Sequence, residues 1–258
     1  MENIVELKNL KKSYGLKEAV KGIDLEIRAG ELFVFVGPNG AGKTTTLKIM
    51  AGLLKPTSGT VMIGGFDMHK EPMKAKMTMS FVPDVPFVYE KLSAWEMLRF
   101  IGKLYEMKKD DQRKKGEELL KFFSLWDVRD VLIEEFSHGM RQKAVLAAAL
   151  MHDPKLIVLD EPMVGLGPVS IRSFKDLLRR KAGGGMAVVF STLTLSTAEE
   201  LADRIAIIDH GNIIALGTLG ELREKYRSKE NLEEMFLKLV EKEGLPLTLP
   251  SPPGRGQG

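Results

Sequence analysis

The chain has 258 residues, which is enough for one large domain or two small ones with a sizeable core. Its 38 basic and 35 acidic side chains leave a net charge of +3, too small an excess to indicate a nucleic-acid-binding protein. It has no cysteine, so disulfides, thiolate metal sites and cysteine nucleophiles are excluded. The longest strongly apolar stretch, residues 144–151, is far shorter than the ~20 residues that span a bilayer, and the N-terminus lacks the apolar core of a signal peptide. We therefore expect a cytosolic protein.

Four buried strands are predicted, with helices between them. Residues 1–30 are expected to form short strands, because Ile23, Leu25 and Ile27 alternate with charged side chains. The continuous apolar run Leu32–Val36 is typical of a strand that is buried on both faces. Similar runs lie at 156–159, 186–190 and 205–208. This alternation of buried strands and helices predicts an α/β fold with a mostly parallel sheet covered on both faces.

Helices are predicted where apolar residues recur with helical spacing. The first covers residues 43–54, and Ser93-x-x-Glu96 and Ser196-x-x-Glu199 are capping boxes that indicate two further helix starts. From about 86 to 152 the helix patterns occur without a convincing strand, which predicts a helical insertion in the α/β core.

The C-terminal segment 227–243 carries a last amphipathic helix pattern. The tail, residues 244–258, has eight Pro or Gly in 15 positions and is predicted to be disordered.

The segment Gly37–Thr44 matches the phosphate-binding pattern G-x-x-x-x-G-K-[ST] in full, between a predicted strand and a predicted helix. Glycines allow backbone N–H groups to converge on an anion, and the helix N-terminus adds partial positive charge. Lys43 is expected to reach the β- and γ-phosphates and Thr44 to offer its hydroxyl to Mg²⁺. The residues that would form this nucleotide site are Gly37, Pro38, Asn39, Gly40, Ala41, Gly42, Lys43, Thr44 and Thr45.

Two acidic residues complete the predicted site. The apolar run 156–159 ends in Asp160 and Glu161, which places both at the carboxyl edge of the sheet, where ligands bind. We expect Asp160 to hold Mg²⁺ and Glu161 to orient or deprotonate a water in line with the γ-phosphate.

With these motifs in place, residues 2–242 resemble the ATP-binding subunit of ABC transporters. The distinguishing segment is Phe136–Gln142 (FSHGMRQ), which is similar to the family signature Leu-Ser-Gly-Gly-Gln. The resemblance implies that Ser137 and Gly139 cap the γ-phosphate of ATP held by a second subunit, and that Tyr14 stacks on adenine. It also implies a P-loop NTPase core with an N-terminal antiparallel β subdomain and an inserted helical subdomain, together forming an ATP-binding domain over residues 1–226.

Three positions depart from the family pattern. Asp84 stands where the family has Gln or Glu; it keeps an oxygen donor for Mg²⁺ or water and is assigned to the catalytic and metal sites with Lys43 and Glu161. Gly167 replaces an aspartate that reaches across the dimer. Leu193 replaces the histidine that contacts the γ-phosphate, and leucine can neither donate a hydrogen bond nor carry charge. We therefore expect normal binding of Mg-ATP and slowed hydrolysis.

The partners implied by the resemblance are a second ATP-binding subunit, in a homodimer or a heterodimer, and a separate membrane permease that contacts the helical insertion. This arrangement would hold the chain at the inner face of the cell membrane. The C-terminal pattern resembles subunits of exporters. Two alternatives remain open: a degenerate or regulatory ATP-binding subunit, and an ABC ATPase that acts without a transporter. A phosphate-loop kinase or GTPase fits less well, since the Asn-Lys-x-Asp guanine motif is missing.

Overall fold

The computed structural model describes residues 2–226 and 232–242. Within these residues, the main sheet has six strands in the order β10-β9-β3-β8-β7-β6. Their bounds are β3 Leu32–Val36, β6 Met79–Val82, β7 Leu156–Asp160, β8 Ala187–Thr192, β9 Arg204–Asp209 and β10 Asn212–Gly217. Only β10 pairs antiparallel, with β9. The predicted α/β fold with a mostly parallel sheet is therefore confirmed.

The N-terminal residues form two long strands of a second, antiparallel sheet. Its order is β2-β1-β4-β5, with β1 Asn3–Tyr14, β2 Lys17–Arg28, β4 Ser58–Ile63 and β5 Phe66–Asp67. The expectation of short strands was wrong, because β1 contains register shifts, one of them between Leu7 and Leu10, where Asn9 adopts a φ of 46°. Such a bulge breaks the alternation of side chains without ending the strand.

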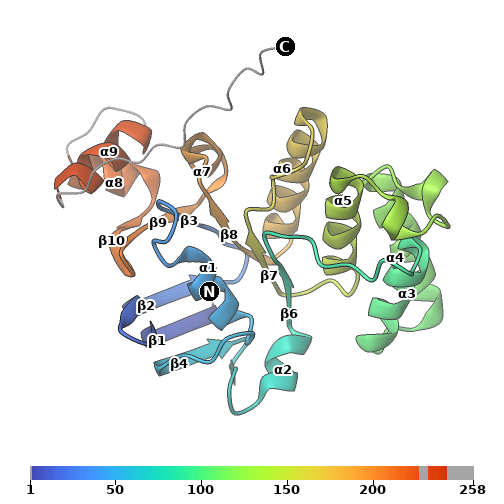
Figure 1. Ribbon diagram of the computed structural model, residues 1–258, viewed down its shortest axis with the longest axis horizontal. Coiled ribbons are helices and arrows are strands. Elements are labelled where there is room, and N and C mark those ends of the chain that lie inside the picture. The colour runs from blue at the N-terminus through green and yellow to red at the C-terminus, as the bar shows by residue number, and fades with distance from the viewer. Residues whose placement is uncertain (1, 227–231, 243–258) are drawn as a thin grey trace.

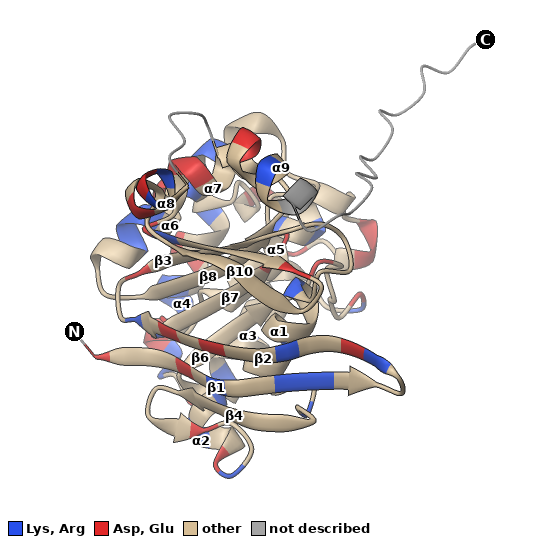
Figure 2. Ribbon diagram, turned by 90° about the vertical axis from the view of Figure 1, so that its left-hand side faces the viewer, with Lys and Arg blue, Asp and Glu red and all other residues tan. Residues whose placement is uncertain are grey.

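The main sheet separates two hydrophobic clusters because alternate residues of each strand face opposite sides. Phe33 and Phe35 belong to the cluster shared with α1 (Lys43–Met50) and the antiparallel sheet. Val34 and Val36 belong to the cluster on the other face, which is shared with the helices from residue 94 onward. Figures 1 and 2 show the antiparallel strands on one side of the main sheet and α6–α9 on the other.

The helical insertion forms one end of the molecule in Figure 1. It contains α3 (Ala94–Leu104), α4 (Lys109–Phe122), the short 3-10 helices η1 (Trp126–Val128) and η2 (Ile133–Glu135), and α5 (His138–Ala149). The capping box at α3 is confirmed: Ser93 accepts from the Glu96 N–H, and the Glu96 carboxylate accepts from the Ser93 N–H. Trp95 packs edge-on against Trp126 inside the insertion.

Two helix boundaries differ from the prediction. The first helix, α1, ends at Met50 rather than residue 54, since Gly52 then turns the chain with a φ of +65°. The capping box at Ser196 is wrong, because α7 (Leu195–Leu201) begins before that residue and has Thr194 as its N-cap. The Thr194 N–H bonds the Thr192 side chain, which bends the chain into α7 directly after β8.

The remaining helices are α2 (Pro72–Met77), α6 (Pro168–Gly183), α8 (Leu219–Lys225) and α9 (Leu232–Lys242). The amphipathic pattern near the C-terminus thus coincides with α9, which has Leu232 and Met235 buried. The tail predicted to be disordered, 244–258, lies outside the described residues. Among the residues described, no helix is both long and apolar enough to cross a bilayer.

Candidate active site

The phosphate-binding segment is a loop between β3 and α1 that is packed closely against neighbouring backbone. A Cβ on Gly37 would overlap the carbonyl oxygen of Ile208 in β9, so only glycine fits there. The Gly211 N–H donates to the Ala41 carbonyl at 2.8 Å, and the Gly211 carbonyl accepts from the Lys21 N–H at 2.9 Å. The turn after β9 therefore holds the loop in place through glycine backbone.

Lys43 lies inside this loop, at the first turn of α1. Its ammonium donates to the carbonyl oxygens of Gly37 and Pro38 at 2.6 and 3.0 Å, and the side chain is buried. Burial lowers the pKa of Lys43, while the negative charges of Glu161 and Asp160 oppose that shift. The ammonium is thus held beside the loop by carbonyl dipoles and lies within the field of both acidic residues.

Asp160 ends β7 and is almost completely buried. One oxygen, Oδ1, accepts from the Ser191 hydroxyl at 2.6 Å. The other, Oδ2, is buried and has no hydrogen-bond partner in the part of the chain that the structure describes. Buried carboxylate oxygens normally have a partner. An unpartnered oxygen of this kind fits the oxygen-rich ligand set that Mg²⁺ prefers.

Glu161 follows in a left-handed backbone conformation, with a φ of 48°. Its N–H donates to the Ser191 hydroxyl at 3.0 Å, and its Oε2 accepts from the Leu193 N–H at 3.4 Å. Burial raises the pKa of Glu161, opposed mainly by the charge of Lys43. A carboxylate whose pKa is raised in this way is a better proton acceptor.

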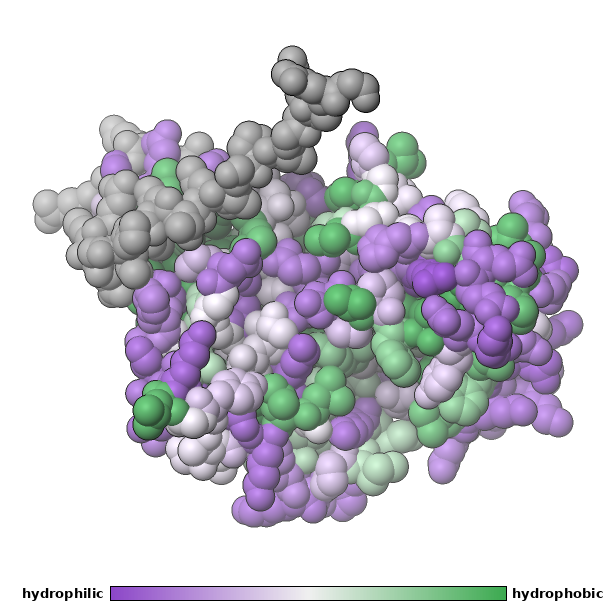
Figure 3. Space-filling model, in the orientation of Figure 1, coloured by the Kyte–Doolittle hydropathy of each residue, from purple (hydrophilic) through white to green (hydrophobic). Residues whose placement is uncertain are grey.

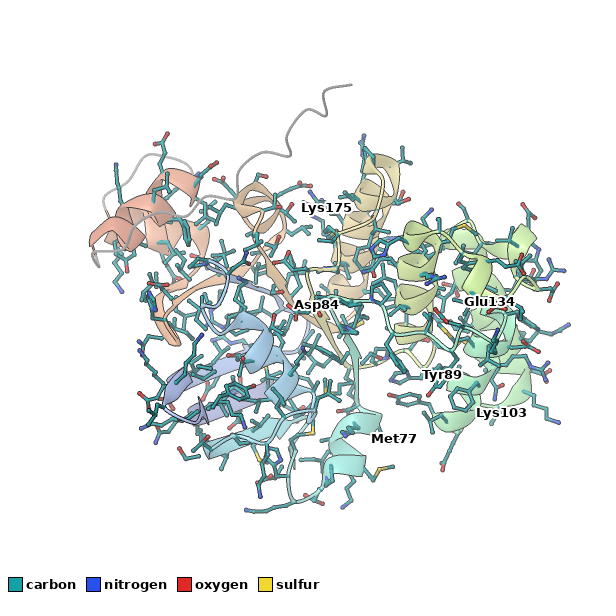
Figure 4. The ribbon with its side chains drawn as sticks, in the orientation of Figure 1. Met77, Asp84, Tyr89, Lys103, Glu134 and Lys175 are labelled. Carbon is teal, nitrogen blue, oxygen red and sulfur yellow. The ribbon has the colours of Figure 1, made fainter. Side chains whose placement is uncertain are left out.

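Lys43, Thr44 and Glu161 line a cleft of about 320 Å³. Its walls are Tyr14, Lys17, Ala19, Asn39, Gly40, Ala41, Gly42, Lys43, Thr44, Thr45, Asp84, Glu161 and Leu193. Tyr14 is half exposed at the end of β1, with the Lys12 ammonium 5.1 Å from its ring centre. Asp84 comes from the segment after β6 and lies near the centre of the molecule in Figure 4. The tertiary structure thus brings four distant segments of the predicted site to one cleft.

The signature residues do not line that cleft. Ser137 is the N-cap of α5, and its exposed hydroxyl accepts from the Met140 N–H at 3.3 Å. Gly139 lies against the backbone of Gly165, where a Cβ would come within 2.8 Å of the Gly165 carbonyl oxygen. Within one chain Ser137 is thus exposed to solvent, Gly139 is partly buried against Gly165, and neither lines the cleft at the phosphate loop.

Two residues of the site were missed by sequence reasoning. Ser191 bonds both acidic residues, and Gly211 supports the phosphate loop. The signal for Ser191 was available, because a serine that follows an apolar strand run at the carboxyl edge is positioned like Asp160. Gly211 gave no signal beyond an ordinary turn, since its contact with Ala41 depends on the pairing of β9 with β3, strands that lie far apart in the sequence.

Comparison with known proteins shows similarity to ATP-binding proteins of ABC transporters. A family model described as ABC transporter matches residues 20–164. The linearmycin resistance ATP-binding protein LnrL of Bacillus subtilis is 39% identical over 219 residues, which covers 85% of this chain and 70% of LnrL. The daunorubicin/doxorubicin resistance ATP-binding protein DrrA of Streptomyces peucetius is 39% identical over 224 residues, covering 87% of this chain and 68% of DrrA.

Solved structures show the same similarity. An ATP-binding subunit of an ABC transporter matches with a TM-score of 0.88 and 29% identity, over 92% of this chain and 99% of that one. A dimeric ATP-binding cassette in a post-hydrolysis state, bound to ADP and Pi, matches with a TM-score of 0.77 and 28% identity, over 83% of this chain and 98% of that one.

Proposed function

Since this chain belongs to the ABC transporter family, as an ATP-binding subunit and ABC-type ATPase, we propose that it binds Mg-ATP in the cleft described above, dimerises on the nucleotide and powers an exporter through a separate membrane permease. The observation that carries the proposal is the convergence of the phosphate loop, the buried Lys43 and Glu161 on one cleft, with Asp160 close enough for its charge to act on Lys43. The domain that carries this function spans residues 1–226, with α9 appended.

Different residues are proposed to bind the phosphates, the adenine and the Mg²⁺ ion. Backbone N–H groups of the loop and the Lys43 ammonium hold the phosphates, and Tyr14 stacks on adenine. Thr44 and Asp160 would hold Mg²⁺, and Asp84, which also lines the cleft, would contribute a further oxygen. Bound Mg²⁺ neutralises negative charge on the phosphates. Lys43 must exchange its bonds to Gly37 and Pro38 for phosphate oxygens, which are stronger acceptors for an ammonium.

Glu161 accepts the proton of the attacking water. Its raised pKa suits a general base, and the Leu193 N–H and Lys43 charge keep the carboxylate near the loop. The chain has no imidazole at position 193 to stabilise the transferring phosphoryl group. Loss of one preorganised donor costs about 10²–10³ in rate. We therefore propose that hydrolysis is slow while binding is normal.

Dimerisation would complete the site from outside the chain. Ser137 and the α5 N-terminus are exposed, and a second subunit that presents them to the nucleotide would add hydroxyl and N–H donors. The partner subunit is a second copy of this chain or a related subunit with a complete set of catalytic residues.

The permease would dock on the insertion. A groove of about 240 Å³ lies between β6 and the helices α3 and α5, lined on one side by Phe87 and Tyr89. These two rings are 76% and 49% exposed, and Figure 3 shows apolar patches among hydrophilic side chains on this face. Trp95, at the start of the insertion, packs edge-on against Trp126 instead and does not offer a docking surface. Docking here would keep the chain at the inner face of the cell membrane.

Export is proposed because the two bacterial relatives are named for drug resistance. The transported compound would be chosen by the permease rather than by this chain.

The test combines nucleotide titration with phosphate release. Mg-ATP is expected to raise the melting temperature and to shift the chain from monomer to dimer, with Glu161→Gln retaining both effects while abolishing phosphate release. Lys43→Ala serves as the control that loses both effects. No change in melting temperature and no dimer with the wild-type chain would refute the proposal.

A degenerate or regulatory subunit is the second candidate, favoured by Leu193 and Gly167. It predicts stabilisation by ATP with no phosphate release, even when the neighbouring permease is present. The transport-independent alternative predicts salt-sensitive binding to RNA or DNA instead.

A further inference from the structure

Ser191 joins Asp160 to Glu161, which lines the cleft, through one hydroxyl. It is fully buried at the end of β8. Its O–H donates to Asp160 Oδ1 at 2.6 Å, and its oxygen accepts from the Glu161 N–H at 3.0 Å. A single side chain therefore bonds a carboxylate and the backbone of the next residue.

The strand register explains this placement. Asp160 pairs directly with Ser191 across the parallel strands β7 and β8. Val158 and Val189 precede them by two residues in each strand and belong to the cluster on the α1 side of the sheet. Because side chains alternate along a strand, Asp160 and Ser191 also face α1, which begins at Lys43.

We propose that Ser191 is a positioning residue for the ATPase reaction: it fixes Asp160 and Glu161 relative to each other and to the phosphate loop. This inference rests on the proposed function, in which Asp160 holds Mg²⁺ and Glu161 activates water. The hydroxyl bonds Oδ1 and so leaves the buried, unpartnered Oδ2 as the oxygen available to a metal ion.

The same hydroxyl also holds Glu161 in its left-handed conformation. A non-glycine residue with a φ of 48° is strained and persists only where surrounding bonds maintain it. The Glu161 N–H bond to Ser191 and the Oε2 bond from the Leu193 N–H are two such bonds, one at the backbone and one at the carboxylate. Removal of the first frees the backbone to rotate and moves the carboxylate away from the water it would activate.

Only a side chain that donates and accepts at the same atom can perform this task. Serine and threonine hydroxyls do both, whereas alanine does neither. Ser80 provides a matched control: it is a buried serine in β6 of the same sheet, and its hydroxyl donates to the Ala149 carbonyl at 2.6 Å, away from both acidic residues.

The experiment compares the full-length wild type with Ser191→Ala, Ser191→Thr and Ser80→Ala. Calorimetry measures ATP binding in EDTA and then in increasing MgCl₂, and phosphate release gives kcat and KM. We expect Ser191→Ala to bind ATP in EDTA as the wild type does. Its apparent Mg²⁺ affinity and kcat should each fall by about 10–100-fold, the usual effect of losing an outer-shell partner. Ser191→Thr should restore most of both, and Ser80→Ala should change neither.

Three results would overturn the inference: an unchanged Mg²⁺ dependence and kcat in Ser191→Ala, an equal loss in Ser80→Ala, or a well-folded Ser191→Thr as impaired as Ser191→Ala. If Ser191→Ala does not fold, Ser191→Cys replaces it, since a thiol is only a weak donor and acceptor. Failure of the proposed function is distinguishable, because the wild type would then not bind ATP or Glu161→Gln would release phosphate normally.

Discussion

The backbone N–H of Leu193 donates a hydrogen bond to the Glu161 carboxylate at 3.4 Å, although the Leu193 side chain is half exposed and offers no polar atom. The loop after β8 thus keeps a contact that positions Glu161 and lacks a side-chain donor for the phosphoryl group. Glu161 is therefore still oriented, and only the donor to the phosphoryl group is missing. A substitution that supplies this donor at position 193 should restore hydrolysis.

Leu193→His is expected to raise kcat by about 10²–10³-fold, because it adds a donor that acts in the transition state, with little change in KM for Mg-ATP. The side chain is exposed enough for the ring to fit without displacing the core. Phosphate release by the purified chain measures the effect. Leu193→Ala is the control: it keeps the backbone N–H and should match the wild type. A wild type that is already fast, with no gain from histidine, would contradict slowed hydrolysis.

Gly167→Asp is expected to stabilise the fold by about 0.5–1 kcal/mol, from a helix cap and a negative charge at a helix N-terminus. Gly167 is the N-cap of α6 with no side-chain bond, its φ of −73° suits any residue, and a Cβ would meet no atom within 4 Å. Thermal unfolding measures the gain. Gly167→Ala supplies no cap and should fall slightly below the wild type, so equal melting temperatures for the two variants would disprove the capping argument.

The stability of the chain should fall between pH 6.5 and pH 4 through His152. Burial lowers the pKa of His152 to about 4, with partial opposition from the Met79 backbone and Asp153. Below pH 6.5 the unfolded chain takes up a proton at His152 and the folded chain does not. The free energy of unfolding is therefore unaffected by His152 above pH 6.5 and decreases as the pH falls towards 4. The loss at pH 5 is on the order of 2 kcal/mol.

His152→Phe provides the comparison for this pH effect, because it keeps a ring stacked on Tyr105, whose ring centre lies 3.5 Å away. Denaturant unfolding at pH 7.5 and pH 5 should show a smaller loss in the variant than in the wild type. Identical losses would mean that His152 does not titrate as described.

Two glycines of the phosphate loop should respond differently to alanine. Gly40 has a φ of 80° and open space around its Cβ position, so Gly40→Ala should cost about 1 kcal/mol of backbone strain. At Gly37 the Cβ would overlap the Ile208 carbonyl, and Gly37→Ala should cost about 3 kcal/mol. Unfolding of the nucleotide-free chain measures both. A reversed order would show that the loop does not pack on β9 as described.

Local patterns were read correctly where a short run of residues decides the structure. The run Leu32–Val36 became a buried central strand, and the Ser93 box capped α3. The capping box predicted at Ser196 was wrong. The Thr194 N–H bonds the Thr192 side chain at the end of β8, and α7 therefore begins earlier, with Thr194 as its N-cap. The long β1 was missed because a bulge conceals its alternation.

The sequence alone determined the α/β class, the phosphate loop and the acidic pair. Each of these features follows from a short local pattern of residues that has a known physical basis. Only the tertiary structure decided that Ser191 bridges Asp160 and Glu161, that Gly211 supports the loop, and that Leu193 still holds Glu161 through its backbone. These contacts join strands and turns 30 or more residues apart. They depend on strand register and on backbone groups. Because backbone groups are the same in nearly every residue, the sequence does not indicate which of them will form a bond.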